Sequence, residues 1–148
     1  MEASGNFSLD PALVAEALRA ADLPLATVLL RDEARFPWLV LVPRRAGLAE
    51  PWDLLPGDRA AFWSEAERVG AALGAAAKAD KINLAAFGNI TRQLHLHVVA
   101  RVEGDAAWPG SVIGLPRTPY EGGVPAFWPA LLGTLGVADR PLTDRQSP

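Results

Sequence analysis

A run of five apolar residues, Trp38 to Val42, most constrains how this chain can fold. The run contains no polar side chain, two of its members are valines, and Pro43 follows it directly. An alternating strand needs only one covered face, whereas a continuous apolar run needs both faces covered. We therefore predict a strand at 38–42 that lies inside a sheet, with other parts of the chain packed against each side.

Two helices are predicted on either side of this strand in the sequence. Ser8 or Asp10 can cap a first helix that starts at Pro11, and apolar residues at helical spacing extend it to Ala21. Asp58 can cap a longer helix that reaches about Lys78. One apolar face of that longer helix comprises Phe62, Ala66, Val69, Leu73 and Ala77.

Further short segments have the pattern of strands. Apolar or alternating residues at 25–30, 81–87 and 93–101 predict three of them. A short helix is predicted at 125–135, and the last residues, 139–148, have the composition of a tail.

The order of these elements predicts the fold class. Adjacent strand pairs have short links and only one helical crossover separates them, so we expect an α+β fold with an antiparallel sheet of about five strands. The chain shows no internal repeat and no second core. We therefore expect one domain at 1–148, with its core at about 20–110 and a C-terminal extension at 111–148.

Composition narrows the classes of function. The chain has no cysteine, which excludes disulfides, thiolate catalysis and cysteine-ligated zinc. Its net charge is −3 and its basic residues form no cluster, so we expect a small-molecule substrate and no nucleic-acid partner. No apolar run approaches the roughly 18 residues of a membrane span, and the N-terminus lacks the pattern of a secretory signal. We expect a cytoplasmic protein with no membrane partner.

The alternating segment Gln93 to Val99 carries the candidate chemistry. As a strand, it would place Gln93, His95 and His97 on one face and aliphatic residues on the other. His95 and His97 are the only histidines in the chain. Three polar groups in a row cost free energy unless they meet water, a partner or a ligand. We therefore expect this face to border a cleft.

Spacing alone leaves three uses of the two histidines open. They can form a solvated stripe without function. They can bind a metal ion, although zinc sites need three or four ligands and carboxylates would have to supply the rest, so no metal is expected. A neutral imidazole can also act as a nucleophile at phosphorus or as a base, because its ordinary pKa leaves much of it unprotonated at neutral pH.

The segment Gln93 to Val99 resembles the motif of the histidine triad (HIT) family, in which three histidines alternate with apolar residues. The apolar strand that ends in Pro43-Arg44-Arg45 is similar to a strand of that family. A long helix, a strand with Asn83 and a turn at Gly88-Asn89 then precede the motif in the family's order. The resemblance covers about residues 20–110.

The resemblance implies a HIT-like fold, usually as a homodimer, and a nucleotide-binding hydrolase or transferase. Its substrates would be nucleoside phosphate esters, anhydrides or phosphoramidates. His95 stands at the position of the middle histidine, which attacks the α-phosphate and forms a nucleotidyl-histidine intermediate. His97, Gln93, Asn83 and Asn89 would contact phosphate or nucleotide. No cofactor is expected.

Several positions depart from the family. Gln93 replaces the first histidine, and glutamine can hydrogen-bond but cannot carry a proton. We therefore expect an unusual substrate or a weaker catalyst; the alternative is a nucleotide-binding module with reduced or lost catalysis. Trp38 lies near a further family histidine and can line a base pocket or pack in the core. Leu30 or Arg31 falls where a polar residue on the ribose or phosphate side is expected, and Arg101 is expected to be a solvated strand end.

Overall fold

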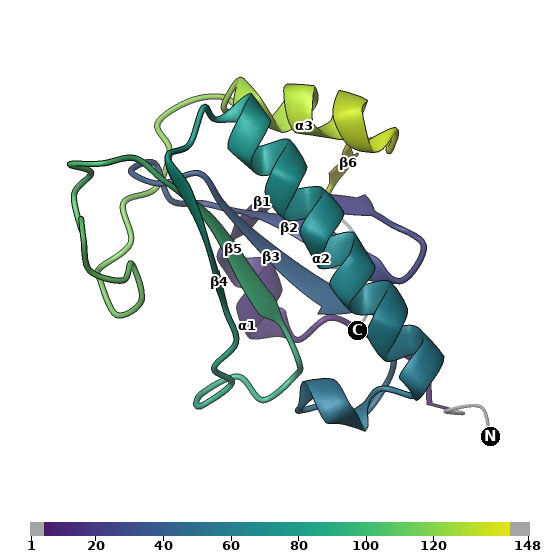
Figure 1. The fold of residues 1–148 in the computed structure, drawn as a ribbon. Helices are drawn as coiled ribbons and strands as arrows, with labels where there is room; N and C mark the ends of the chain where they lie inside the picture. The colour runs from purple at the N-terminus through teal and green to yellow at the C-terminus, as the bar shows by residue number, and fades with distance from the viewer. Residues whose placement is uncertain (1–4, 143–148) are drawn as a thin grey trace.

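Six antiparallel strands form the sheet of this computed structural model, which describes residues 5–142 (Figure 1). The strands are β1 (Ala17–Asp22), β2 (Ala26–Arg31), β3 (Trp38–Pro43), β4 (Lys81–Ala85), β5 (Leu96–Arg101) and β6 (Arg140–Pro141). Their spatial order is β4-β5-β3-β2-β1-β6. The helices are α1 (Pro11–Ala15), α2 (Pro56–Ala76) and α3 (Phe127–Leu135), with a 3₁₀ turn at Pro51–Asp53. The predicted α+β class is confirmed.

Strand β3 lies in the interior of the sheet, between β2 and β5, and all six of its residues are buried. Leu39 and Leu41 pack into one hydrophobic cluster, whereas Trp38, Val40 and Val42 pack into another. The prediction that this run needs cover on both faces is therefore confirmed.

The two faces of the sheet are covered by different parts of the chain (Figure 1). Helices α2 and α3 cover the first face and contribute Phe62, Val69 and Trp128 to its core. The second face is covered more thinly, by α1, the residues before it and Val112. Because this second layer is thin, it leaves room for a cavity.

The long helix α2 begins two residues before the predicted start. Pro56 occupies its first turn, where proline costs no hydrogen bond, and Leu55 is the N-cap residue. Asp58 therefore lies inside the first turn, where its carboxylate pairs with Arg45 at 2.7 Å. The predicted apolar face is confirmed by the buried residues Phe62, Ala66, Val69 and Leu73.

The N-terminal helix is much shorter than predicted. Asp10 caps it, its side chain accepting a hydrogen bond from the Ala12 amide, but α1 ends at Ala15. The next residues form β1, which pairs with β2 across a bulge between Ala17 and Arg19. The bulge places Ala17 and Ala20 in the same cluster, a spacing of three that imitates a helix.

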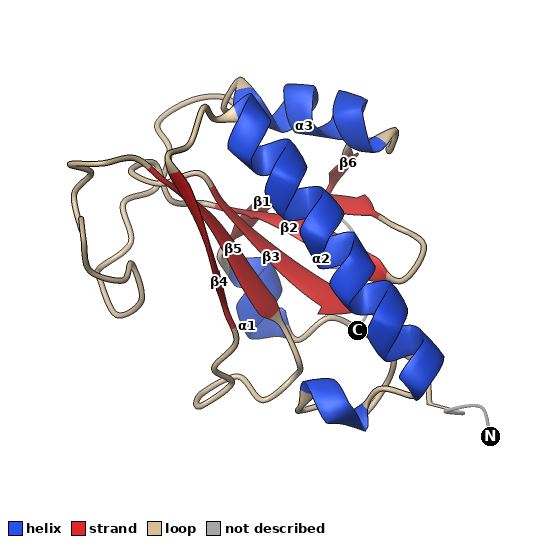
Figure 2. Ribbon diagram, in the orientation of Figure 1, coloured by secondary structure: helices blue, strands red, loops and turns tan. Residues whose placement is uncertain are grey.

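The C-terminal part of the chain contributes to the main core. Residues 102–126 contain no helix or strand, and this long loop leads from β5 to α3 (Figure 2). The helix predicted at 125–135 is confirmed as α3. The expected tail is wrong for Arg140 and Pro141, which pair with β1 as a sixth strand; residues 143–148 lie outside the described residues. Within residues 5–142, no helix has the length and apolar character to cross a membrane.

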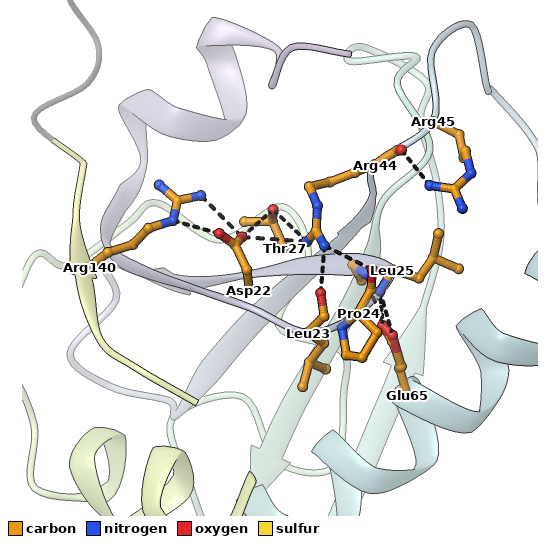
Figure 3. Close-up of polar contacts among 10 residues, drawn as sticks. Asp22, Leu23, Pro24, Leu25, Thr27, Arg44, Arg45, Glu65 and Arg140 are labelled. Atoms are coloured by element: carbon orange, nitrogen blue, oxygen red, sulfur yellow. Dashed lines mark hydrogen bonds and ion pairs between the residues drawn. The ribbon is translucent and has the colours of Figure 1, made fainter. Parts of the chain in front are cut away.

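A buried carboxylate ties α2 to the turn between β1 and β2 (Figure 3). Glu65 is only 5% exposed, and its oxygens accept hydrogen bonds from the amides of Leu25 and Ala26 at 2.9 Å. Beside it, the Arg44 guanidinium donates to the carbonyl of Leu23 at 2.6 Å. These contacts satisfy main-chain groups that the tight turn would otherwise leave unpaired.

We expect Glu65→Ala to lower the free energy of unfolding by about 3 kcal/mol, because two buried amides lose a charged acceptor. Urea denaturation followed by circular dichroism measures the change. The matched control is Glu67→Ala, an exposed position on the same helix, which should change stability by less than about 0.5 kcal/mol. Equal losses in the two variants would show that the Glu65 contacts contribute nothing specific.

Candidate active site

A cavity of about 410 Å³ lies on the thinly covered face of the sheet. Its size is within the range of small-ligand pockets. It is lined by residues from α1, from β2 and β3, from the loop after β4, from the start of β5 and from the 113–115 segment. These residues are Ala12, Leu13, Glu16, Arg31, Trp38, Phe87, Gly88, Asn89, Ile90, Thr91, His95, His97, Ile113, Gly114 and Leu115.

The two histidines lie side by side in the wall of this cavity. Their ring centroids are 5.0 Å apart in an edge-to-face arrangement, and the residues are 7% (His95) and 8% (His97) exposed. His97 lies within β5, opposite Val40 of β3 and Ala85 of β4. His95 lies just before β5, and both rings line the same cavity. The structure therefore places the two imidazoles next to each other, as predicted.

The tautomer of His95 follows from its main-chain partner. Its Nδ1 lies 2.6 Å from the carbonyl oxygen of Gln93. A carbonyl oxygen can only accept, so Nδ1 carries the hydrogen and donates it. In the neutral ring Nε2 is then unprotonated and keeps its lone pair. This is the form that a nucleophile or base requires.

The tautomer of His97 is the opposite one. The indole Nε1–H of Trp38 donates to its Nδ1 at 3.0 Å, and an indole nitrogen can only donate. In the neutral ring Nε2 therefore carries the hydrogen and is a donor. Burial lowers the pKa of His97 to about 4, and the positive charges that His95 and Arg31 can carry add to this shift. His97 is thus a neutral hydrogen-bond donor at neutral pH.

A cation stands beside the histidines. The Arg31 guanidinium lies over the Trp38 ring, 4.4 Å from its centroid, and pairs with the carboxylate of Glu16, the C-cap residue of α1. Its Nε is buried and has no hydrogen-bond partner within residues 5–142. A guanidinium in the wall of a cavity favours an anionic ligand through its charge. Arg31 therefore gives the wall of the cavity a positive charge.

Gln93 does not line this cavity, so the predicted row of three polar side chains on one face is wrong at residue 93, where the side chain bonds to the segment before α1 instead. Its side-chain oxygen accepts from the Asp10 amide, and its side-chain nitrogen donates to the Ser8 carbonyl, both at 2.8 Å. The amide group thus pairs with the main chain as a neighbouring strand would. It holds the segment that enters α1 close to the cavity.

The two asparagines are placed differently. Asn89 is exposed and lies on the cavity rim. Asn83 lies two residues before Ala85 on β4, outside the cavity lining, and its side-chain oxygen accepts from Arg101 at 2.9 Å. The structure therefore brings Asn89, His95 and His97 together and leaves Asn83 apart.

Arg101 is buried, so the expectation of a solvated strand end is wrong. Its guanidinium forms two hydrogen bonds to Asp105, at 2.8 and 2.9 Å, and a third to the Gly110 carbonyl. The hydrogen bond from Arg101 lowers the pKa of Asp105 to about 2. Trp108 lies near the same guanidinium, 5.7 Å from ring centroid to charge, and does not line the cavity. The cluster anchors the loop that carries the 113–115 wall.

Two parts of the wall were not predicted. Leu13 comes from α1 and Glu16 from its C-cap, and the 113–115 segment comes from the irregular loop. Neither stretch carries a residue type that signals a site by itself, and only the tertiary structure brings them to the histidines. Among residues 5–142, no group of three or more His, Cys, Asp or Glu residues is arranged to hold a metal ion.

Known proteins resemble this chain in sequence and in fold. The HIT domain profile matches residues 13–104, and no curated protein matches the chain. Histidine triad proteins of known structure are similar to it over most of its length. One from Bradyrhizobium japonicum is 42% identical over 79% of this chain and 88% of its own, with a TM-score of 0.77. One from Sinorhizobium meliloti 1021 is 44% identical over 78% of this chain and 86% of its own, with a TM-score of 0.76. One from Marinobacter aquaeolei VT8 is 36% identical over 79% of this chain and 86% of its own, with a TM-score of 0.77.

The chain therefore belongs to the HIT domain family. Its α+β fold with an antiparallel sheet matches the fold of those structures. Family membership supports, in general terms, a hydrolase or transferase that binds nucleotides.

We expect the imidazole of His97 to stay unprotonated down to about pH 5. The unfolded chain has an ordinary pKa near 6.5 and binds the proton first, so stability is full above pH 6.5 and falls as the pH drops towards 4. The shift corresponds to about 3 kcal/mol. Nuclear magnetic resonance of the two imidazoles measures the titration, and denaturation from pH 7 to 4 measures the loss.

The control for this prediction is His97→Gln, whose side-chain oxygen can still accept from Trp38. It also assigns the two imidazole signals. Between pH 6.5 and 4, the slope of its unfolding free energy against pH should be smaller than that of the natural protein. The difference in slope should correspond to the binding of at most one proton. A His97 ring that titrates near pH 6.5 would contradict the assigned tautomer.

Proposed function

We propose that this protein is a nucleotidyl hydrolase or transferase that acts at the α-phosphate of nucleoside phosphates, with His95 as the nucleophile. The observation that carries the proposal is the tautomer of His95. Its Nδ1–H donates to a main-chain carbonyl, so Nε2 is unprotonated. The ring itself lines a cavity of the size of a small ligand. A second imidazole beside it offers a donor for phosphate oxygen.

The proposed reaction has two displacements at phosphorus. The lone pair of His95 Nε2 forms a bond to the α-phosphorus, and the bond to the leaving group breaks, its electron pair departing with the leaving atom. The imidazole then carries a positive charge, which the Gln93 carbonyl stabilises through the Nδ1–H bond. Water or another acceptor next attacks phosphorus, the electron pair returns to Nε2, and the acceptor's proton passes to solvent.

The other polar groups of the cavity suit a phosphate ligand. His97 donates from Nε2 without carrying charge, and this donation strengthens as charge develops on a phosphoryl oxygen. Arg31 supplies positive charge at the wall of the cavity. Asn89, on the rim, has an amide that can donate to the ligand.

The apolar side of the cavity suits a nucleoside. Leu13, Trp38, Ile113 and Leu115 line it, and a purine or pyrimidine ring can pack against such side chains. A phosphate site and an apolar wall within one cavity fit a nucleotide better than they fit inorganic phosphate alone.

We expect His95→Ala to reduce turnover of nucleoside phosphates by a factor on the order of 10³ or more, because no other group supplies the attacking lone pair. Mass spectrometry of the acid-quenched protein should detect a nucleotidyl adduct on the natural enzyme and none on the variant. Both proteins should be thermally stabilised by nucleoside monophosphate, since ligand binding favours the folded state. Exposed Arg92→Ala, near the same motif, is the matched control and should keep the adduct.

The outcomes separate the two functions that the family allows. A natural protein that is stabilised by nucleotides but never forms an adduct is a binding module without catalysis. Full activity in His95→Ala would remove the proposed nucleophile.

We further propose that the protein is a homodimer that pairs through the free edge of β4. This strand lies at one end of the sheet, and none of its five residues is buried. Leu84 is 47% exposed on the strand, and Phe87 and Ile90 in the following loop are 51% and 98% exposed. An open edge flanked by exposed apolar side chains favours pairing with a second copy.

We expect Leu84→Lys to convert the dimer into a monomer, because an edge charge opposes strand pairing. Light scattering coupled to size-exclusion chromatography measures the mass. Val124→Lys, which changes an exposed valine in the 102–126 loop, is the control and should leave the dimer intact. A natural protein that is monomeric at every concentration would overturn the proposal.

A further inference from the structure

The cavity holds few groups that can give a proton to a departing atom. Within the described residues, the lining side chains that carry an ionisable group are Glu16, Arg31, His95 and His97. Arg31 remains a cation at any physiological pH. Its guanidinium donates to the Glu16 carboxylate, which therefore acts as an acceptor. His95 is used as the nucleophile, so only His97 is left as a candidate acid.

Trp38 removes His97 from that role. The indole N–H occupies Nδ1 of His97, and a second proton there would set two donors against each other. The indole cannot turn round to accept, as a hydroxyl or a second imidazole could. The remaining proton, on Nε2, belongs to a neutral ring and is shared in a hydrogen bond without being released. Trp38 is therefore a positioning residue that makes His97 a donor and not an acid.

The guanidinium above Trp38 supports the same conclusion. Arg31 lies 4.4 Å from the indole centroid and His97 lies 5.6 Å from it, so a protonated His97 would place a second cation against the same indole. Burial of the imidazole adds to the cost of that charge. Three separate features thus keep His97 neutral: the indole donor, the neighbouring cation and the loss of water.

From this geometry we infer that the enzyme uses nucleoside phosphoanhydrides, whose leaving group departs without a proton, in preference to phosphoramidates and alkyl phosphoesters. The inference rests on the proposed function and names its substrate class. In the first displacement the Nε2–phosphorus bond forms and the bridging phosphorus–oxygen bond breaks. The electron pair leaves with the bridging oxygen, which becomes a terminal oxygen of a phosphate or polyphosphate. An alkoxide or an amine anion is too basic to leave in the same way.

The test compares substrates that share one nucleoside and differ only in the leaving group. An anhydride, a phosphoramidate and a series of aryl phosphodiesters of graded phenol acidity all give the same nucleotidyl-His95. Since kcat/KM reports the first displacement, it isolates the leaving-group step. We expect kcat/KM for the anhydride to exceed that for the phosphoramidate by roughly 10²-fold or more, the contribution typical of a general acid. The aryl series should fall steeply as the phenol becomes less acidic.

The variant Trp38→Phe tests whether the hydrogen bond from Trp38 is what prevents His97 from acting as an acid. It keeps an aromatic ring under Arg31 and removes the donor to Nδ1, so that a proton on Nδ1 no longer faces a second donor. Arg31 and burial still oppose the charge, so the gain of an acid is partial. We expect a shallower dependence on the leaving group and a new decline of kcat/KM with rising pH for the phosphoramidate, the signature of a group that must be protonated. Phe87→Leu is the control, because Phe87 also lies near His97, at 6.2 Å between centroids, but donates nothing. It should change kcat/KM for all substrates by a similar factor.

The failures of the two proposals are distinguishable. Equal kcat/KM for phosphoramidate and anhydride, with an adduct trapped on His95, would overturn the inference on leaving groups and leave the nucleophile in place. Absence of an adduct with every substrate would overturn the proposed function itself. If Trp38→Phe does not fold, the substrate series on the natural enzyme still decides the matter.

Discussion

Strand β3 has to be covered on both faces, and the rest of the structure follows from that constraint. Its six buried residues alternate between two clusters, so the chain must supply two layers. The long helix and α3 supply the first with large apolar side chains. The second layer is assembled from a five-residue helix, the segment before it and an irregular loop. A layer built from such short pieces does not fill its space, and the cavity with both histidines lies there.

Within that cavity the chemistry of each imidazole is decided by a neighbour that cannot ionise at neutral pH. A main-chain carbonyl holds His95 as the Nε2-bare tautomer, and an indole holds His97 as the Nε2–H tautomer. Neither partner can exchange protons, so the two rings cannot trade roles as a pair of linked histidines could. The result is one ring with a bare Nε2 and one neutral donor, which suits the proposed attack on phosphorus but provides no acid. The proposed preference for anhydrides is a consequence of these two hydrogen bonds.

Much of the fold was predictable from patterns of adjacent residues. The apolar run of β3, the long helix and the pair of histidines depend on local sequence, and each appears as expected. The predictions failed where tertiary pairing outweighed local spacing. A bulge in β1 gave alanines the spacing of a helix, and the tail gained strand β6 from its pairing with β1. The wall from α1 and residues 113–115 could not be predicted, since nothing in those stretches encodes which residues they will contact.

Gln93 shows how a departure from a motif can be read in structural terms. The group at position 93 that orients His95 is the main-chain carbonyl, which any residue supplies equally well. The side chain at that position is therefore free to change without disturbing His95. Here the Gln93 side chain hydrogen-bonds to the main chain of Ser8 and Asp10 and so fixes the segment that enters α1. Glu16, the C-cap residue of that helix, in turn pairs with Arg31. A glutamine at position 93 is thus compatible with the proposed nucleophile. In the proposed mechanism its cost falls on proton transfer, for which the Trp38 hydrogen bond leaves His97 unsuited.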